Sequence, residues 1–352
     1  MSFTTLDPTD FVVSSDSIVA PAWSSNNPTL GNFYTASATV SNKITSDAFY
    51  LNVYQLPTAS IGSAVQFSIA YGNASGLGAP YYNTLVPGTT PSLTTYKQYK
   101  TLVYGPSVTG SQGFNFGGKC TNAPDIWAIN VDRNRYKESL FPGTFNLTLS
   151  GSGGFLYLTD SSNDTSVINY LDCGRVFNIV SGTNGNAVSA TPTNATTNGQ
   201  TVSGSYGFYL PDIGTIILNP SAIGLSPTYG GISVTPSTAV NPSTPYSSVS
   251  NTRLFNAIVN GGNFQLNSQE TVSSNYVFVR IKNAEYNYTS NPTFISGSGN
   301  LVYATLINSP QTYVTTVGLY NTNSELLAVG KMSRPLVKDF TKEALVRVKL
   351  DW

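Results

Sequence analysis

Apolar and polar residues alternate in several short stretches of the chain, a pattern typical of strands that bury one face. Near the start, Phe49, Leu51 and Val53 alternate with polar or aromatic neighbours. At the end, Ala344, Val346 and every second residue to 352 form one apolar face. Similar patterns occur at 65–71, 145–149, 154–160, 205–218, 275–283 and 313–330. The chain is therefore predicted to be rich in antiparallel strands.

Three segments instead favour short helices. Residues 91–105 place large apolar side chains three apart. Residues 250–262 place Leu254 and Ile258 on one face, with Ser250 or Asn251 as the expected N-cap and two glycines at the end. Asn219 followed by Pro220 predicts the start of the third helix, because an Asn side chain can cap and Pro fits the first helical position.

We expect a mainly β fold with an antiparallel β-sandwich or jelly-roll-like core, long loops and two or three short helices. Residues 1–45 mix turn formers with aromatics without a clear period, and they are predicted to form an extended N-terminal arm. Residues 46–352 are predicted to form one elaborated β domain, with a C-terminal β segment at about 265–352.

Composition narrows the classes of function. Charged residues make up 10% of the chain, with 17 basic and 17 acidic residues, so a global attraction to nucleic acid or an anionic membrane is not expected. No run approaches 18 apolar residues, so no membrane span is expected either. Aromatics at 12% argue for a folded chain. The first residues lack the basic and apolar regions of a signal peptide, which predicts synthesis in the cytoplasm.

The absence of histidine excludes Ser-His-Asp and Cys-His catalysis and removes the commonest metal ligand. Cys120 and Cys173 are too few for a cysteine zinc site; two buried free thiols and a pair both stay open. Asp160 and Asp164 fit no standard calcium loop, and a polar turn is the simpler interpretation. We therefore expect no enzyme, no metal and no cofactor.

Two other classes of function stay open. A glycan hydrolase needs only two carboxylates brought close together, although nothing in the sequence marks such a pair. A receptor or polysaccharide site needs an aromatic platform, and five tyrosines are candidates for it, with core or interface packing as the alternative. These tyrosines are Tyr50, Tyr54, Tyr81, Tyr82 and Tyr99.

Basic residues are concentrated near the C-terminus, where six of the 17 Lys and Arg lie. The pattern predicts a hairpin over 313–330, a crossover over 331–342 and a last strand over 344–352. Basic side chains protect an edge strand from random pairing, and they also suit docking to an acidic neighbour. The candidate assembly contacts are Lys331, Arg334, Lys338, Lys342, Arg347 and Lys349.

The segment PQTYVTTVGLYNTNSELLAVGKMSRPLVKDFTKEALVRVKLDW resembles the C-terminal end of virion structural proteins from contractile-tailed bacteriophages, particularly those of cyanobacteria. Its core, TVGLY, a turn and ELLAV, is also similar to a hairpin of phage tail and fibre proteins. Two further stretches, YGFYLPDIGTIILNP and RYKESLFPGTFNLTLSG, share this character. These motifs are structural, so the resemblance carries no active site with it.

The resemblance implies a non-enzymatic structural subunit of a tailed phage virion, made in the host cytoplasm and present in the particle. Its expected partners are other copies of itself and other virion proteins, with a glycan or receptor as a further possibility. The tail, baseplate or neck is the expected position, and a capsid-associated or decoration protein is the alternative. A charge-poor, aromatic-rich composition agrees, because the cores of permanent interfaces lose charge and gain aromatics.

Overall fold

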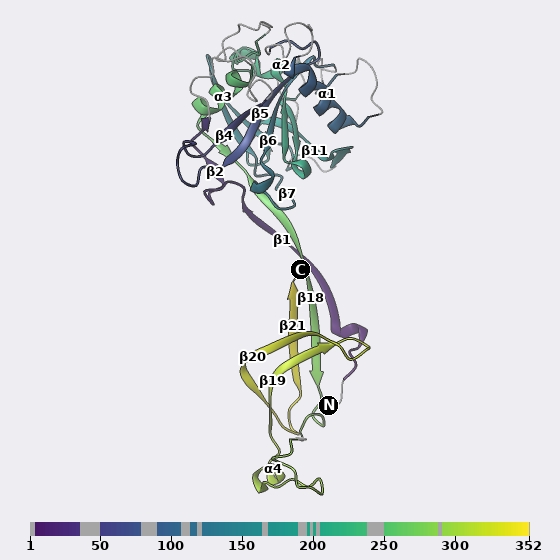
Figure 1. The fold of residues 1–352 in the computed structure, drawn as a ribbon. Coiled ribbons are helices and arrows are strands. Elements are labelled where there is room, and N and C mark those ends of the chain that lie inside the picture. Colours follow the sequence, from purple (N-terminus) through teal and green to yellow (C-terminus); the bar gives the residue numbers. More distant parts are fainter. Residues whose placement is uncertain are drawn as a thin grey trace. The chain divides into compact units, whose positions relative to one another are not determined.

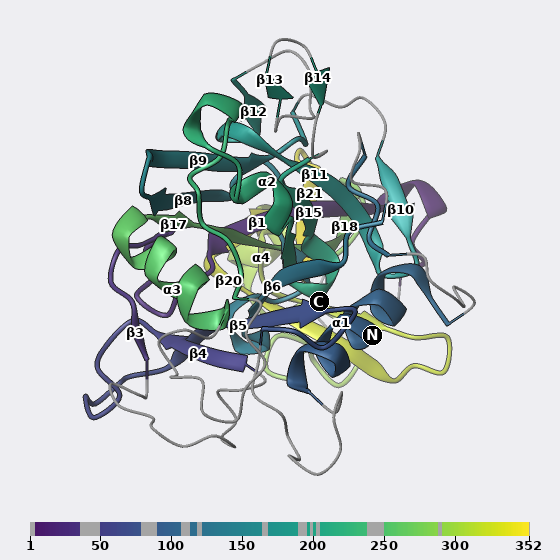
Figure 2. The same ribbon diagram turned by 90° about the horizontal axis from the view of Figure 1, so that it is seen from above.

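The computed structural model (Figures 1 and 2) divides the chain into two compact units. The larger unit comprises residues 18–270, and the smaller comprises residues 1–17 and 271–352. The structure describes residues 4–35, 50–78, 90–106, 113–117, 122–163, 168–188, 196–197, 200–201, 205–237, 250–287 and 291–351.

A single antiparallel sheet dominates the larger unit. Its strands follow the order β2-β17-β8-β9-β11-β15-β16-β6-β5-β4-β3, and β10 and β12 also pair with β11. The strands of the unit are β2 (Thr29–Leu30), β3 (Tyr34–Thr35), β4 (Tyr50–Tyr54), β5 (Val65–Asn73), β6 (Asp125–Val131), β7 (Ser139–Leu140), β8 (Asn146–Gly151), β9 (Gly154–Asp160), β10 (Asn169–Leu171), β11 (Gly174–Thr183), β12 (Asn186–Ala187), β13 (Thr196–Thr197), β14 (Gln200–Thr201), β15 (Gly207–Leu210), β16 (Thr215–Leu218) and β17 (Phe264–Gln265).

The central strands are buried on both faces. Successive residues of β16 alternate between two apolar clusters: Ile216 and Leu218 belong to the larger cluster, and Ile217 belongs to the smaller one. Residues Ile126 and Trp127 of β6 divide in the same way. A strand that is covered on both faces needs apolar residues at consecutive positions. This explains why the apolar residues of β16 are consecutive and do not alternate with polar ones.

The sheet curls, so that strands far apart in its order face each other across the larger cluster. The ring centroid of Phe67 in β5 lies 5.1 Å from that of Phe264 in β17, and Trp23 lies 5.0 Å from Phe264. The indole of Trp23 donates a hydrogen bond to the Phe264 carbonyl, and the indole of Trp127 donates to the Ser250 carbonyl. Buried indole N–H groups are thus paired, as low dielectric surroundings require.

The predicted helices are present. They are α1 (Pro91–Tyr104), α2 (Pro220–Ile223) and α3 (Ser250–Gly261). As expected, the side chain of Asn219 caps α2 by accepting a hydrogen bond from the Ser221 amide. At α3, the Ser250 hydroxyl instead accepts from the Ser237 amide and donates to the Gly78 carbonyl, so it ties the helix start to two loops. Among the described residues, no helix is both long and apolar enough to cross a membrane.

The smaller unit contains a sheet in the order β1-β18-β21 and a separate two-stranded hairpin of β19 and β20. Both β1 (Phe11–Pro21) and β18 (Asn267–Ile281) also have residues in the larger unit. The other elements of the smaller unit are α4 (Ala304–Asn308), β19 (Thr312–Tyr320), β20 (Leu326–Lys338) and β21 (Ala344–Asp351).

The units do not coincide with the predicted ranges 1–45 and 46–352. Residues 11–21 form a strand of the β1-β18-β21 sheet, so the start of the chain is divided between the units near residue 17. Residues 36–45 lie outside the described part. Hydrogen bonding between segments about 250 residues apart in sequence sets this division, and local pattern carries no signal for such pairing.

The mainly β fold class is confirmed, with 45% strand and 17% helix. The core is formed by one curled antiparallel sheet whose ends face each other. The described residues include four α-helices, one more than the largest number expected. The helix that was not expected is α4, which has only five residues.

Candidate functional sites

The two basic residues of β21 lie together over one ring. Strand β21 pairs with β18 so that Lys349 lies opposite Tyr276. The guanidinium of Arg347 lies 5.5 Å from the Tyr276 ring centroid, and the ammonium of Lys349 lies 5.9 Å from it. Lys349 also forms an ion pair of 3.1 Å with Asp351, and this contact raises the pKa of Lys349. Both cations are exposed, so they remain accessible to a partner.

Lys331 and Arg334 belong to the hairpin, and the predicted crossover at 331–342 is wrong in its first part. Strand β20 continues to Lys338, with Lys331 opposite Thr316 and Leu336 opposite Val314. The register shifts between these pairs, which is the mark of a bulge. The bulge keeps the long strand paired where the sequence suggested a break after Gly330. Lys331 and Arg334 are both exposed.

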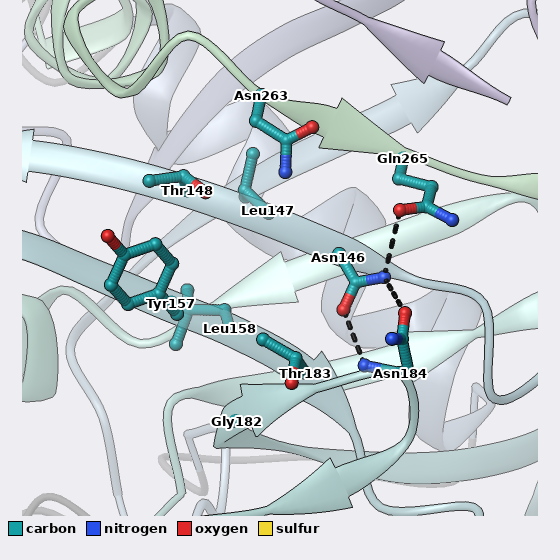
Figure 3. A pocket seen from close by; sticks show the side chains of 10 residues that line it. All are labelled: Asn146, Leu147, Thr148, Tyr157, Leu158, Gly182, Thr183, Asn184, Asn263 and Gln265. Carbon is teal, nitrogen blue, oxygen red and sulfur yellow. Dashed lines mark hydrogen bonds between the residues drawn. The ribbon is translucent and has the colours of Figure 1, made fainter. Parts of the chain in front are cut away.

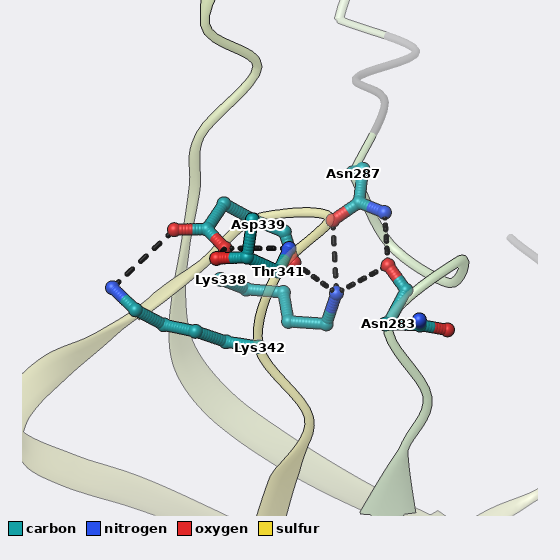
Figure 4. A network of polar contacts seen from close by, with 6 residues as sticks. All are labelled: Asn283, Asn287, Lys338, Asp339, Thr341 and Lys342. Carbon is teal, nitrogen blue, oxygen red and sulfur yellow. Dashed lines mark hydrogen bonds and ion pairs between the residues drawn. The ribbon is translucent and has the colours of Figure 1, made fainter.

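Lys338 is not a surface contact, and this part of the prediction is wrong. Its side chain is 0% exposed (Figure 4). The ammonium donates to the carbonyls of Asn283 and Asp339, at 2.9 and 2.8 Å, and to the side-chain oxygen of Asn287, at 2.9 Å. Three donors meet three acceptors, so the charge is buried without an unpaired hydrogen. Lys338 therefore holds two loops of the smaller unit together.

Lys342 lies in the turn between β20 and β21, where it forms an ion pair of 3.3 Å with Asp339. The six candidates thus do not form one continuous strip. Arg347 and Lys349 share a site, Lys331 and Arg334 lie on the hairpin, and Lys338 is internal.

Sequence analysis missed the exposed apolar surface of the smaller unit. Leu326, Leu327, Val329, Phe340 and Leu345 are each more than half exposed. Neither apolar cluster of the chain contains a described residue from 4–17 or 271–351. The adjacent Leu326 and Leu327 could have indicated this exposure. Two neighbouring residues of a regular strand point to opposite faces, so both cannot lie on one buried face.

A polar cleft of 160 Å³ lies at the side of the large sheet (Figure 3). Asn146 organises it: its side-chain amide donates to the side-chain oxygens of Asn184, at 2.8 Å, and Gln265, at 3.3 Å. Its own oxygen accepts a hydrogen bond of 2.6 Å from the Asn184 backbone amide. These bonds fix the orientation of the amides, so the NH₂ groups of Asn184 and Gln265 remain as donors.

The rest of the cleft is also uncharged. The Tyr157 ring lies opposite Thr148 and stacks on Phe155, with ring centroids 6.5 Å apart. The lining residues are Asn146, Leu147, Thr148, Tyr157, Leu158, Gly182, Thr183, Asn184, Asn263 and Gln265. Amides, hydroxyls and an exposed aromatic ring suit a neutral, hydroxyl-rich ligand, because none of these groups attracts a net charge.

The five predicted platform tyrosines are not all placed together. Tyr50 and Tyr54 lie on the outward face of β4, whereas Tyr99 lies on α1, where burial raises its pKa. Tyr81 and Tyr82 lie outside the described residues. The aromatic pair beside the cleft, Phe155 and Tyr157, was not among the candidates, and its alternation in β9 was the available signal.

Asp160 has a structural setting. Its buried carboxylate accepts hydrogen bonds from the backbone amides of Gly143 and Ser162, and burial is the main reason why its pKa is raised. Asp164 and Cys120 lie outside the described residues. Cys173 is a buried free thiol, and burial raises its pKa to about 11.

Comparisons with family models, curated proteins and solved structures found no match for this chain.

Proposed function

We propose that the chain is a non-enzymatic structural subunit of a tailed phage virion, repeated by symmetry in the tail, baseplate or neck. The resemblance of its C-terminal segment suggests the particle, and a capsid-associated or decoration role is the alternative. The mechanism is geometric: the larger unit is a rigid block, and the smaller unit provides the surfaces that bind neighbours. Other copies and other virion proteins are the proposed partners.

The exposed apolar surface of the smaller unit is the observation that carries this proposal. Leu326, Leu327 and Val329 of β20 are exposed to solvent, and no described residue of the unit belongs to either apolar cluster. Apolar area left in water costs about 25 cal/mol per Å², so such a surface is expected to be covered in the working state. An assembly supplies that cover.

The direct test is to purify intact particles of the phage that encodes the chain and to locate the protein by mass spectrometry and subunit-resolved imaging. The proposal predicts a fixed number of copies at symmetry-related positions, with the smaller unit in contact with its neighbours. Absence of the protein from purified particles would contradict it.

A second test addresses the basic pair of β21. Replacing Arg347 and Lys349 by Glu is expected to impair incorporation into particles, because the cations over Tyr276 are placed to meet an acidic neighbour. The chain should stay folded, since both side chains are exposed. Lys97→Glu on α1, also an exposed position, is the matched control. Unchanged incorporation would leave edge protection as the role of the pair.

Glycan binding is the second candidate function, and the amide-lined cleft is the observation that favours it. The donors of Asn184 and Gln265 suit sugar hydroxyls, and the Tyr157 ring offers an apolar face on which the C–H face of a sugar can pack. Because the lining has no charged side chain, a neutral hexose polymer is the expected ligand.

Binding of neutral and acidic oligosaccharides by the full chain on a glycan array tests this second function. Tyr157→Ala and Gln265→Ala should each reduce binding of a neutral glycan by about tenfold, the equivalent of about 1.4 kcal/mol. Tyr170→Ala, at another exposed tyrosine, is the control. Equal losses in Tyr157→Ala and Tyr170→Ala would reject the cleft as the site.

A further inference from the structure

The outward face of β8 and β9 repeats one arrangement of side chains. Cross-strand pairing places Thr148 opposite Tyr157 and, two residues further along each strand, Ser150 opposite Phe155. Residues directly opposite each other in an antiparallel pair share a face, and so do residues two apart in one strand. The face therefore carries two successive pairs, each of which combines one hydroxyl group with one aromatic ring.

Both rings are available to a ligand. Phe155 is 59% exposed and Tyr157 is 52% exposed, whereas the leucines that alternate with them in β9 are buried in the larger apolar cluster. The ring centroids lie 6.5 Å apart, and the ring planes are inclined by 29°. The two rings thus present their faces in similar directions, at a spacing comparable with the length of one hexose residue in an extended chain.

Only the first of the two pairs lies in the polar cleft. Thr148 and Tyr157 line the cleft beside the amides of Asn184 and Gln265 (Figure 3), whereas Ser150 and Phe155 lie beyond it. The second pair continues this surface along β9 towards the turn that joins β8 to β9. A single sugar in the cleft leaves the Phe155 ring exposed, and a second sugar linked to the first can cover it.

The segments around both pairs are uncharged. Residues 146–157, 182–187 and 263–265 contain no Lys, Arg, Asp or Glu. An acidic polysaccharide or a charged peptide finds no opposite charge in these segments. Hydroxyls, amides and ring faces instead match a ligand that has hydroxyl groups and C–H faces but no charge.

We propose that the cleft and the Phe155 ring together bind a neutral glycan chain that runs along β9, with one sugar over Tyr157 and the next over Phe155. This inference rests on glycan binding, the second candidate function, and adds the class of ligand: an extended neutral polymer. Rings that face in similar directions suit a chain whose successive sugars keep their faces in similar planes, as in β-1,4-linked glucan.

The first measurement is the affinity of the full chain for glucose, cellobiose and cellotriose, by ligand-observed NMR titration. Cellobiose is expected to bind about tenfold more tightly than glucose, the equivalent of about 1.4 kcal/mol, because its second sugar covers Phe155. Cellotriose should bind at least as tightly as cellobiose. Equal affinities for glucose and cellobiose, or no binding of any of the three, would overturn the inference.

Phe155→Ala separates the two sugar positions. It is expected to weaken cellobiose binding by about tenfold, or about 1.4 kcal/mol, and to leave glucose binding within about twofold of the original. Tyr157→Ala should weaken the binding of both sugars. Phe155→Tyr keeps an aromatic ring, so it should keep the preference for cellobiose. Unchanged cellobiose binding in Phe155→Ala, or equal losses for glucose and cellobiose, would reject a second sugar position at this ring.

Tyr170→Ala is the matched control, because Tyr170 is a 68% exposed aromatic residue of β10, outside β8 and β9. It should change neither affinity. Circular dichroism should show the same fold in all variants, since each replaced ring is more than half exposed.

Failure of this inference is distinguishable from failure of the second candidate function. Absence of binding to every glycan on the array would reject glycan binding altogether. Array binding of neutral glycans, combined with equal affinity for glucose and cellobiose, would keep glycan binding and reject the extended chain along β9.

Discussion

The guanidinium of Arg280, in β18, lies 2.6 Å from the side-chain oxygen of Asp10, and this ion pair joins residues 270 positions apart in the sequence. The Asp10 side chain is 10% exposed, and that of Arg280 is 66% exposed. Asp10 also accepts a hydrogen bond from the Asp7 amide, and this bond completes a capping box at the start of the short helical turn Pro8–Asp10 that precedes β1. The pair therefore attaches the start of β1 to the strand beside it.

The ion pair predicts an acid-sensitive attachment. The pKa of Asp10 is held below its ordinary 3.8 chiefly by the hydrogen bond from Arg280. A group with a lowered pKa in the folded state stabilises the fold above its ordinary pKa, and this contribution is lost as the pH falls through the lowered value. Hydrogen exchange in residues 7–13 should therefore speed up when the pH falls from about 5 to below 3.8, after correction for intrinsic rates.

Asp10→Asn should remove this pH dependence and give faster exchange already at pH 7, because the charged partner of Arg280 is lost. Asp16→Asn, in the strand β1 that follows Asp10, is the control. If exchange in Asp10→Asn keeps the acid dependence of the original chain, another carboxylate is responsible.

Lys338→Met is expected to destabilise the smaller unit by about 2–4 kcal/mol, because three buried acceptors lose their donor at once. Lys342→Met, at a side chain that is 58% exposed, should change the free energy of unfolding by no more than about 0.5 kcal/mol. Denaturant unfolding followed by tyrosine fluorescence measures both. Similar small effects would mean that water replaces the Lys338 ammonium without cost.

Phe264→Ala is expected to lower the free energy of unfolding of the larger unit by about 3–5 kcal/mol, since Phe264 is 0% exposed and contacts both Trp23 and Phe67. Phe155→Ala removes the same side chain at a position that is 59% exposed, and a change within about 0.5 kcal/mol is expected. Tryptophan fluorescence during denaturant unfolding reports on the larger apolar cluster, because Trp23 and Trp127 are both buried in it. A loss in Phe264→Ala no larger than in Phe155→Ala would refute the assigned core.

Gly72→Ala is expected to destabilise the packing of α1 on β5 by about 1–3 kcal/mol. A Cβ at Gly72 would lie 2.8 Å from the Tyr96 Cα and 2.9 Å from the Tyr96 nitrogen, and backbone atoms cannot move aside cheaply. Gly297→Ala is the control, because its Cβ meets nothing within 4 Å. Thermal unfolding of the two variants measures the difference, and an unchanged midpoint for Gly72→Ala would show that the helix can shift away.

Local features were predictable because they depend on residues close in sequence. Period-two alternation indicated the strands, and Asn219 with Pro220 indicated the start of α2, since the cap bond reaches only to Ser221. The same reasoning indicated Arg347 and Lys349 on one face of the last strand, because side chains two residues apart in a strand point the same way.

Burial of Lys338 was not predictable, because its acceptors on Asn283 and Asn287 lie more than 50 residues away in sequence. The cleft was not predictable for the same reason, because Asn146 bonds to Asn184, 38 residues away in sequence, and to Gln265, 119 residues away. Composition and periodicity were enough to predict a charge-poor protein of mainly antiparallel strands, and to exclude catalysis by histidine. Long-range pairing alone decided which lysine is internal, where the two units divide and which amides meet, because contacts between distant segments leave no periodic trace in either segment.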